Sequence, residues 1–168
     1  MLGEMIESYK AMAANVFNQS KFHAPIYILN VNGELQIMMC DWGCQEDKQK
    51  TVDKIKDMIK VGKLKEYIFV SESWIVTLDT KKDMRSGVRE YLQDHGSLAN
   101  HPKRTEALFL QYSSPNKEQT FKADINRSDS DVTLSDWEDM GEEKPKKTNP
   151  LSDGRMQNIF TIACADNN

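Results

Sequence analysis

The hydrophobic positions of the chain follow a helical spacing at its start and change to the alternation of strands further on. Between Leu2 and Phe17 apolar side chains recur every three or four residues, which predicts an amphipathic helix. The apolar stripe of this helix could bind a partner protein. Packing on the chain's own sheet is favoured, because helices of globular proteins routinely bury such a stripe.

The next segment has the pattern of a two-stranded hairpin. Two apolar runs, Pro25–Val31 and Glu34–Cys40, flank the pair Asn32-Gly33, which favours the positive φ angles of a two-residue turn. The turn fixes the pairing register, so the side chains of each face can be assigned. The expected core face is almost entirely apolar and consists of Ile26, Ile28, Asn30, Leu35, Ile37 and Met39. The other face is mixed and could carry a partner or a second layer.

Helical spacing returns after the hairpin and then gives way to further strands. A lysine-rich helix is predicted to end near Gly62, and the polar segment 79–100 is predicted to pass over one edge of the sheet. Alternating or apolar runs bounded by turn residues predict the later strands. These are Tyr67–Leu78, Thr105–Tyr112, Thr120–Asn126 and a short one at Val132–Trp137.

Together these elements predict one α+β domain over residues 1–140. Its sheet is mainly antiparallel with five or six strands, and two principal helices pack on it. Residues 141–155 contain Pro145, Pro150 and Gly154, which predict a flexible linker. Residues 156–168 predict an apolar tail that docks on the domain or on a partner subunit.

Composition narrows the classes of function. The 168 residues, 39% of them hydrophobic and 29% charged, have the size and balance of one soluble domain. A net charge of −4 and a pI near 5.4 argue against nucleic acid as a partner, since binding it requires a basic surface. No apolar run approaches the ~20 residues of a membrane-spanning helix, so no membrane association is expected. The three cysteines lack a disulfide spacing and indicate reduced thiols in a cytoplasm.

The chain lacks the common motifs for nucleotides, phosphates and hydrolytic catalysis, so no cofactor is expected. Cys40 and Cys44 are separated by three residues, and a zinc site needs two further ligands. The remaining candidates, Cys164, His23, His95 and His101, do not have the spacing of zinc ligands. We therefore interpret both cysteines as small apolar residues and expect no metal.

A carboxylate interrupts the apolar face of the predicted strand Tyr67–Leu78. Glu72 lies in a row of apolar side chains, and a buried carboxylate needs a partner or a raised pKa. The start of the next strong strand offers His101, Arg104 and Glu106 as neighbours. These four residues form the candidate polar site that the sequence predicts.

The candidate polar site has two interpretations. In the functional one, Glu72 is a base, His101 shuttles a proton and Arg104 holds an anion. In the structural one, Glu72 and Arg104 form an ion pair that fixes the strands. The structural interpretation is favoured, because ion-pair networks produce the same residue pattern as functional sites.

A cation site is a further hypothesis for the same region. If Phe109 pairs with Phe121, Glu106 lies across from Asp124, and Glu72 nearby completes a set of oxygen ligands. Two solvated carboxylates at a sheet edge are favoured over this hypothesis.

Two short segments carry a resemblance to other proteins. Residues 71–74 read SESW and residues 101–108 read HPKRTEAL. They resemble short, uncharacterised prokaryotic proteins that have an E-[AS]-W strand followed by an H-P-x-R-x-E-A-[LI] strand, over about a third of the chain. The resemblance implies no activity. It implies that a set of side chains belongs together, namely Glu72, Trp74, His101, Arg104 and Glu106.

The sequence therefore predicts the function only by class. A non-enzymatic binding or assembly module of the prokaryotic cytoplasm is expected, as a homodimer or with a protein partner, because no catalytic motif is present. The alternative is a small enzyme or ligand-binding protein that uses the candidate polar site. An open cleft or a raised Glu72 pKa favours the alternative, and a closed Glu72–Arg104 pair favours the first class.

Overall fold

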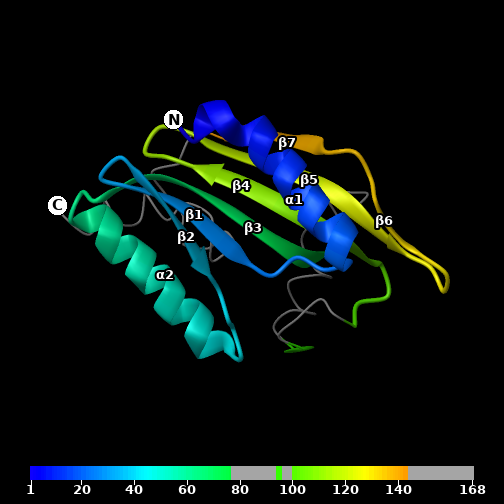
Figure 1. Ribbon diagram of the computed structural model, residues 1–168. Coiled ribbons are helices and arrows are strands. Elements are labelled where there is room, and N and C mark those ends of the chain that lie inside the picture. The colour runs from blue at the N-terminus through cyan, green and yellow to red at the C-terminus, as the bar shows by residue number, and fades with distance from the viewer. Residues whose placement is uncertain (77–93, 96–99, 144–168) are drawn as a thin grey trace.

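The computed structural model describes residues 1–76, 94–95 and 100–143 (Figure 1). A single 3-10 turn, Gly3–Met5, precedes the first of two helices, α1 at Ile6–Ser20 and α2 at Gln45–Lys60. The strands are β1 (Ile26–Val31), β2 (Glu34–Met39), β3 (Leu64–Val76), β4 (Arg104–Ser113), β5 (Glu118–Arg127), β6 (Val132–Leu134) and β7 (Glu138–Glu143).

All strands belong to one antiparallel sheet with the order β2-β1-β3-β4-β5-β6, and β7 also pairs with β5. The predicted fold class, α+β with two helices on a mainly antiparallel sheet, is confirmed. The sheet has seven strands because the segment predicted as one short strand, Val132–Trp137, supplies β6 and is followed by β7.

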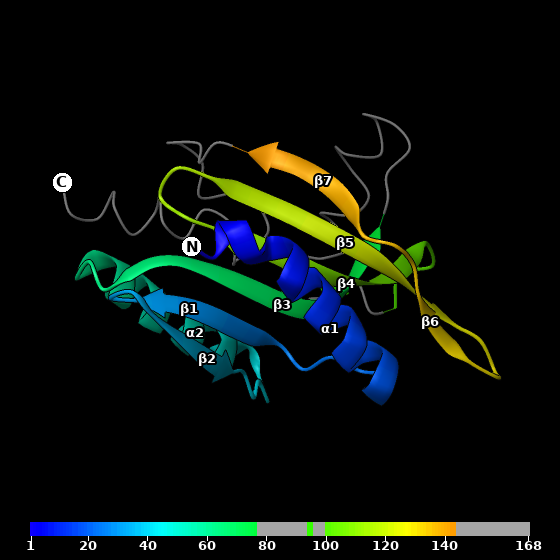
Figure 2. The same ribbon diagram turned by 45° about the horizontal axis from the view of Figure 1, so that its top comes forward.

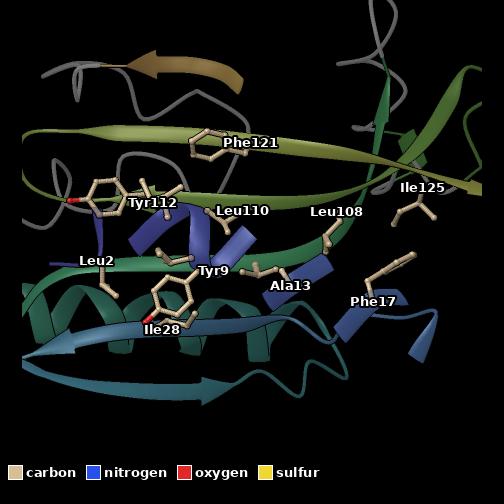
Figure 3. Close-up of a cluster of buried hydrophobic side chains, with 13 residues drawn as sticks. Leu2, Tyr9, Ala13, Phe17, Ile28, Leu108, Leu110, Tyr112, Phe121 and Ile125 are labelled. Atoms are coloured by element: carbon tan, nitrogen blue, oxygen red, sulfur yellow. The ribbon is translucent and has the colours of Figure 1, made fainter. Parts of the chain in front are cut away.

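The two helices pack on opposite faces of the sheet (Figures 1 and 2). α1 covers the middle of one face, where Tyr9 and Phe17 meet side chains of β1, β3, β4 and β5 (Figure 3). α2 covers the other face and packs Val52 and Ile55 against the aromatic pair Tyr27 and Tyr67. β1 and β3 are thus buried from both sides and form the centre of the core.

The β1–β2 hairpin has the predicted register, with Val31 opposite Glu34. Asn32 and Gly33 take φ angles of 54° and 92°, the left-handed conformations that a tight turn of this kind requires. The expected core face is only half covered. Ile28 is buried under α1, whereas the side chains of β2 on the same face are exposed, because α1 does not extend over β2.

The β4–β5 hairpin differs from the register considered for it. Phe121 pairs with Leu110 and not with Phe109. The connecting loop is one residue shorter than that pairing needs, since Ser113 already lies opposite Glu118. A shift of one residue moves a side chain to the other face. Phe121 therefore joins Leu110 under α1, and Phe109 lies on the opposite face.

Neither helix in the described part of the chain has the length and apolar character to cross a membrane. β7 continues to Glu143, three residues past the predicted domain boundary. The rest of the predicted linker and the whole of the predicted tail at 156–168 lie outside the described residues. Most of the predicted excursion at 79–100 also lies outside them.

Candidate functional site

Glu72 lies on β3 in the row that faces α1, two positions beyond the buried Val70. Its carboxylate oxygen Oε1 accepts a hydrogen bond from the backbone N–H of His23, at 2.6 Å. Only 14% of the Glu72 side chain is exposed. The carboxylate therefore ties β3 to the connection that leads from α1 into β1.

The arginine beside Glu72 is Arg127, at the end of β5. Its Nε and Nη2 donate to the two carboxylate oxygens of Glu106 at 2.6 and 2.9 Å, which is a bidentate pair. Nη2 also lies 3.4 Å from Oε2 of Glu72, and Nη1 donates to the carbonyl of Lys21 at 3.3 Å. We call Glu72, Glu106 and Arg127 the carboxylate–arginine cluster. It joins β3, β4, β5 and the end of α1.

Burial is the main reason that the pKa of Glu72 is raised. The nearby Glu106 carboxylate raises it further, while the His23 N–H and the Arg127 guanidinium lower it. The two carboxylates in turn raise the pKa of Arg127 above its already high ordinary value. The cluster thus holds one strongly bound cation between two carboxylates.

Two of the four predicted site residues, Glu72 and Glu106, come together in this cluster. Arg104 lies elsewhere and stacks on Trp74, with its guanidinium carbon 4.8 Å from the ring centroid. The Nδ1 atom of His101 accepts the backbone N–H of Lys103, so this ring takes part in the turn before β4. The closed Glu72–Arg104 pair of the structural interpretation is therefore not formed, and Arg127 takes that place.

Sequence reasoning missed Arg127 and His23. Arg127 ends a row of alternate β5 residues that face α1, and this row is the signal that could have found it. His23 contributes its backbone N–H, for which a sequence carries no signal. Its ring is buried, and burial lowers the pKa of His23. The ring Nδ1 lies 2.7 Å from the Ala24 carbonyl, so the contact between His23 and Glu72 is made by the backbone N–H.

The cation-site hypothesis is wrong. Glu106 lies opposite Ile125, and Asp124 projects to the other face, where it pairs with Lys122 at 3.2 Å. The shortened β4–β5 loop causes this difference. Among the residues that the structure describes, no group of three or more His, Cys, Asp or Glu side chains is placed to hold a metal ion. Cys40 is buried, which raises the pKa of its thiol to about 11.

A hollow of about 670 Å³ lies beside the cluster. Trp74, Arg104, Glu106 and Arg127 contribute to its wall, together with residues of the β5–β6 turn. Arg104 has no carboxylate partner within the described ranges. The hollow could accommodate a small molecule, and Asp131 and Asp124 also line it.

A second buried carboxylate, Glu66, escaped the sequence analysis altogether. It is 8% exposed and lies on β3 at the other end of the α1 face. It accepts hydrogen bonds from the Leu2 N–H, the Asn30 amide and the Tyr112 hydroxyl, at 2.9, 2.9 and 3.0 Å. Each of these donors is thereby satisfied, so Glu66 fixes the start of the chain to β1 and β4.

A different candidate site is an apolar surface beside α1. On β2, Leu35, Ile37 and Met39 are 44%, 66% and 66% exposed. The neighbouring side of α1 also exposes apolar side chains. We call the whole set the apolar surface: Met5, Met12, Val16, Leu35, Ile37 and Met39.

No protein-family profile, curated protein or solved structure matches the chain. The site must therefore be interpreted from its own geometry.

Proposed function

We propose that this chain is a non-enzymatic assembly module, which associates with protein through the apolar surface. The observation that carries the proposal is the row Leu35, Ile37 and Met39, which lies exposed on a strand of the sheet. Soluble proteins rarely leave a continuous apolar row uncovered unless it binds something. The other rows of the same face are buried under α1.

The carboxylate–arginine cluster supports a non-enzymatic role. All three guanidinium nitrogens of Arg127 already donate within the protein, to Glu106, Glu72 and the Lys21 carbonyl. A general base needs a proton-accepting atom that a substrate can reach. Here the oxygens of Glu72 and Glu106 face Arg127 and the His23 N–H, which is the arrangement of a structural ion network.

We also propose that the protein acts in a prokaryotic cytoplasm. The resemblance of residues 71–74 and 101–108 to short prokaryotic proteins supports the origin. A buried Cys40 thiol and an exposed Cys44, neither in a disulfide among the described residues, support a reducing compartment.

Binding of a small anion is a second candidate function. The Arg104 guanidinium lines the hollow and stacks on Trp74, which would hold it ready for a planar or anionic group. The carboxylates in the same wall oppose an anion, so assembly is favoured. If the anion site exists, inorganic phosphate raises the melting temperature of the wild type and not of Arg104→Met. Equal shifts in both proteins would exclude it.

Methionine oxidation tests the assembly function directly. Met39 and Met12 belong to the apolar surface, and Met140 on β7 is a built-in control that is 53% exposed. In dilute purified protein, peroxide should oxidise all three at comparable rates. In the native cell extract or in concentrated protein, Met39 and Met12 should be protected several-fold relative to Met140. Oxidation of Met39 and Met140 at the same rate under all these conditions would contradict assembly through this surface.

A further inference from the structure

The row Leu35, Ile37 and Met39 differs from every other row on its face of the sheet. β2 lies outside the cover of α1 in both views of the molecule (Figures 1 and 2). The adjacent β1 residue, Ile28, is only 2% exposed, so the boundary between covered and uncovered sheet falls between β1 and β2. β2 thus forms an apolar floor next to the helix.

One side of α1 forms a wall above this floor. Helical residues are about 100° apart around the axis, which places Met12 and Val16 on one side of the buried stripe and Lys10 on the other. Met5, the last residue of the 3-10 turn that leads into α1, continues the side of Met12 and Val16. Lys10 lies over the ring of Phe121 on β5, 4.7 Å from its centroid. The three apolar residues therefore look towards β1 and β2. They are 37%, 44% and 41% exposed.

The floor and the wall are large enough for a specific contact. Six half-exposed apolar side chains amount to roughly 500 Å² per copy, the size of the largest apolar patch on an ordinary monomer, which is often functional. Two such surfaces in contact bury about 1,000 Å², the size at which specific protein interfaces begin.

Among the strands that the structure describes, none pairs with the outer edge of β2. The Cys40 N–H donates to the Pro25 carbonyl at 2.9 Å, so Pro25 and Cys40 are a hydrogen-bonded pair of the β1–β2 ladder. Hydrogen-bonded and non-hydrogen-bonded pairs alternate along an antiparallel ladder. Leu35, Ile37 and Met39 therefore occupy non-hydrogen-bonded positions, and their backbone N–H and C=O groups point away from β1. β2 has no proline, lysine or bulge, the usual protections of an edge strand.

We propose that a second copy of this chain covers the apolar surface, face to face, with β2 of each copy inserted beside α1 of the other. The inference rests on the proposed assembly function and names its partner. Stacked sheets lie about 10 Å apart, so the second β2 lies in the layer that α1 occupies and contacts the wall. By two-fold symmetry, α1 of the second copy then covers the outer edge of the first β2.

Charge does not oppose a second copy at the apolar surface. The chain carries a net charge of −4, so two copies repel each other wherever acidic side chains meet. All six residues of the apolar surface are uncharged, and Glu34 at the turn is the single charged residue of β2. A face-to-face contact therefore brings uncharged side chains of the two copies together.

Sedimentation equilibrium of the purified full chain tests the inference. The wild type should sediment at twice 19.3 kDa. Ile37→Lys in the floor and Met12→Lys in the wall should each raise the dimer dissociation constant about a hundredfold, because each places a charge in an apolar contact. Gln36→Lys adds the same charge to the same strand on the other face and should remain dimeric. Unchanged circular dichroism verifies that each variant is folded.

Three results would overturn the inference. A wild type that is monomeric at all concentrations excludes a second copy, and protection of Met39 in the extract would then still support assembly with another protein. A dimer that both lysine variants retain uses a different surface. A dimer that Ile37→Lys dissociates and Met12→Lys does not is paired edge to edge, without the contact to α1.

Discussion

Glu66→Gln should lower the free energy of unfolding at pH 7 by about 3 kcal/mol. The carboxylate accepts three hydrogen bonds in a nearly closed site, from Leu2, Asn30 and Tyr112. An amide presents a donor where the protein supplies only donors, so at least one of these groups loses its acceptor while buried. Urea unfolding with linear extrapolation measures the loss.

Two further variants serve as controls for the effect of Glu66→Gln. Glu34→Gln makes the same chemical change at an exposed position and should alter the free energy of unfolding by less than about 0.5 kcal/mol. Tyr112→Phe removes one of the three donors and should cost about 1 kcal/mol. A loss for Glu66→Gln no greater than that for Glu34→Gln would show that the network does not stabilise the fold.

The effect of Glu66 should depend on pH with a definite sign. Burial by itself raises the pKa of Glu66, but the three hydrogen bonds and the N-terminal ammonium group, 3.5 Å from Oε1, together outweigh it and leave the pKa below its ordinary value of 4.5. The folded state therefore prefers the ionised form. The stabilisation is present above pH 4.5 and is lost as the pH falls through the lowered pKa. The difference in the free energy of unfolding between wild type and Glu66→Gln should therefore shrink below pH 4.5.

Arg127→Met should be the second strongly destabilising change, with a loss of about 2 kcal/mol at pH 7. It leaves Glu72 and Glu106, whose side chains are 14% and 13% exposed, without their common cation. The guanidinium itself is 41% exposed, which reduces the loss below that for a fully buried pair. Arg104→Met is the matched control, since this guanidinium stacks on Trp74, and it should cost less than about 1 kcal/mol.

The loss for Arg127→Met should be smaller at acidic pH. The pKa of Glu72 is raised chiefly by burial, so the folded state prefers the protonated carboxyl group. The stabilisation from this preference is complete below the ordinary pKa of 4.5 and is lost as the pH rises through the raised pKa. Without Arg127 this pKa rises further, and neutralising the carboxylates removes the need for the cation. Unfolding free energies at pH 4 and pH 7 test this, and equal losses at both values would contradict the structural role of the cluster.

Local patterns predicted local structure well. The helical spacing identified α1, and the Asn32-Gly33 turn fixed the hairpin register, because both depend on residues close together in sequence. Glu72 was recognised as unusual because it breaks the alternation of one strand. Each of these features is decided within about a dozen residues.

The partners of Glu72 depend on the order and register of three strands, which local patterns do not fix. Arg127 reaches Glu72 only because β5 lies beside β4 with Phe121 opposite Leu110. The loop between these strands has no turn signature that fixes its length, and an error of one residue exchanged the faces. Glu66 was missed for a simpler reason: β3 begins at Leu64, three residues before the predicted strand.

The two edges of the sheet have different chemistry, and this limits how far an assembly can grow. The edge opposite β2 is formed by the short β6 and by β7, which begins with the exposed residues Glu138 and Asp139. Acidic edges repel one another, so sheets cannot join there into a continuous ribbon. In the proposed dimer, each copy covers the apolar surface of the other, so the assembly closes after two copies. If the proposed dimer forms, the difference between the apolar β2 edge and the acidic opposite edge therefore favours a closed dimer over a filament.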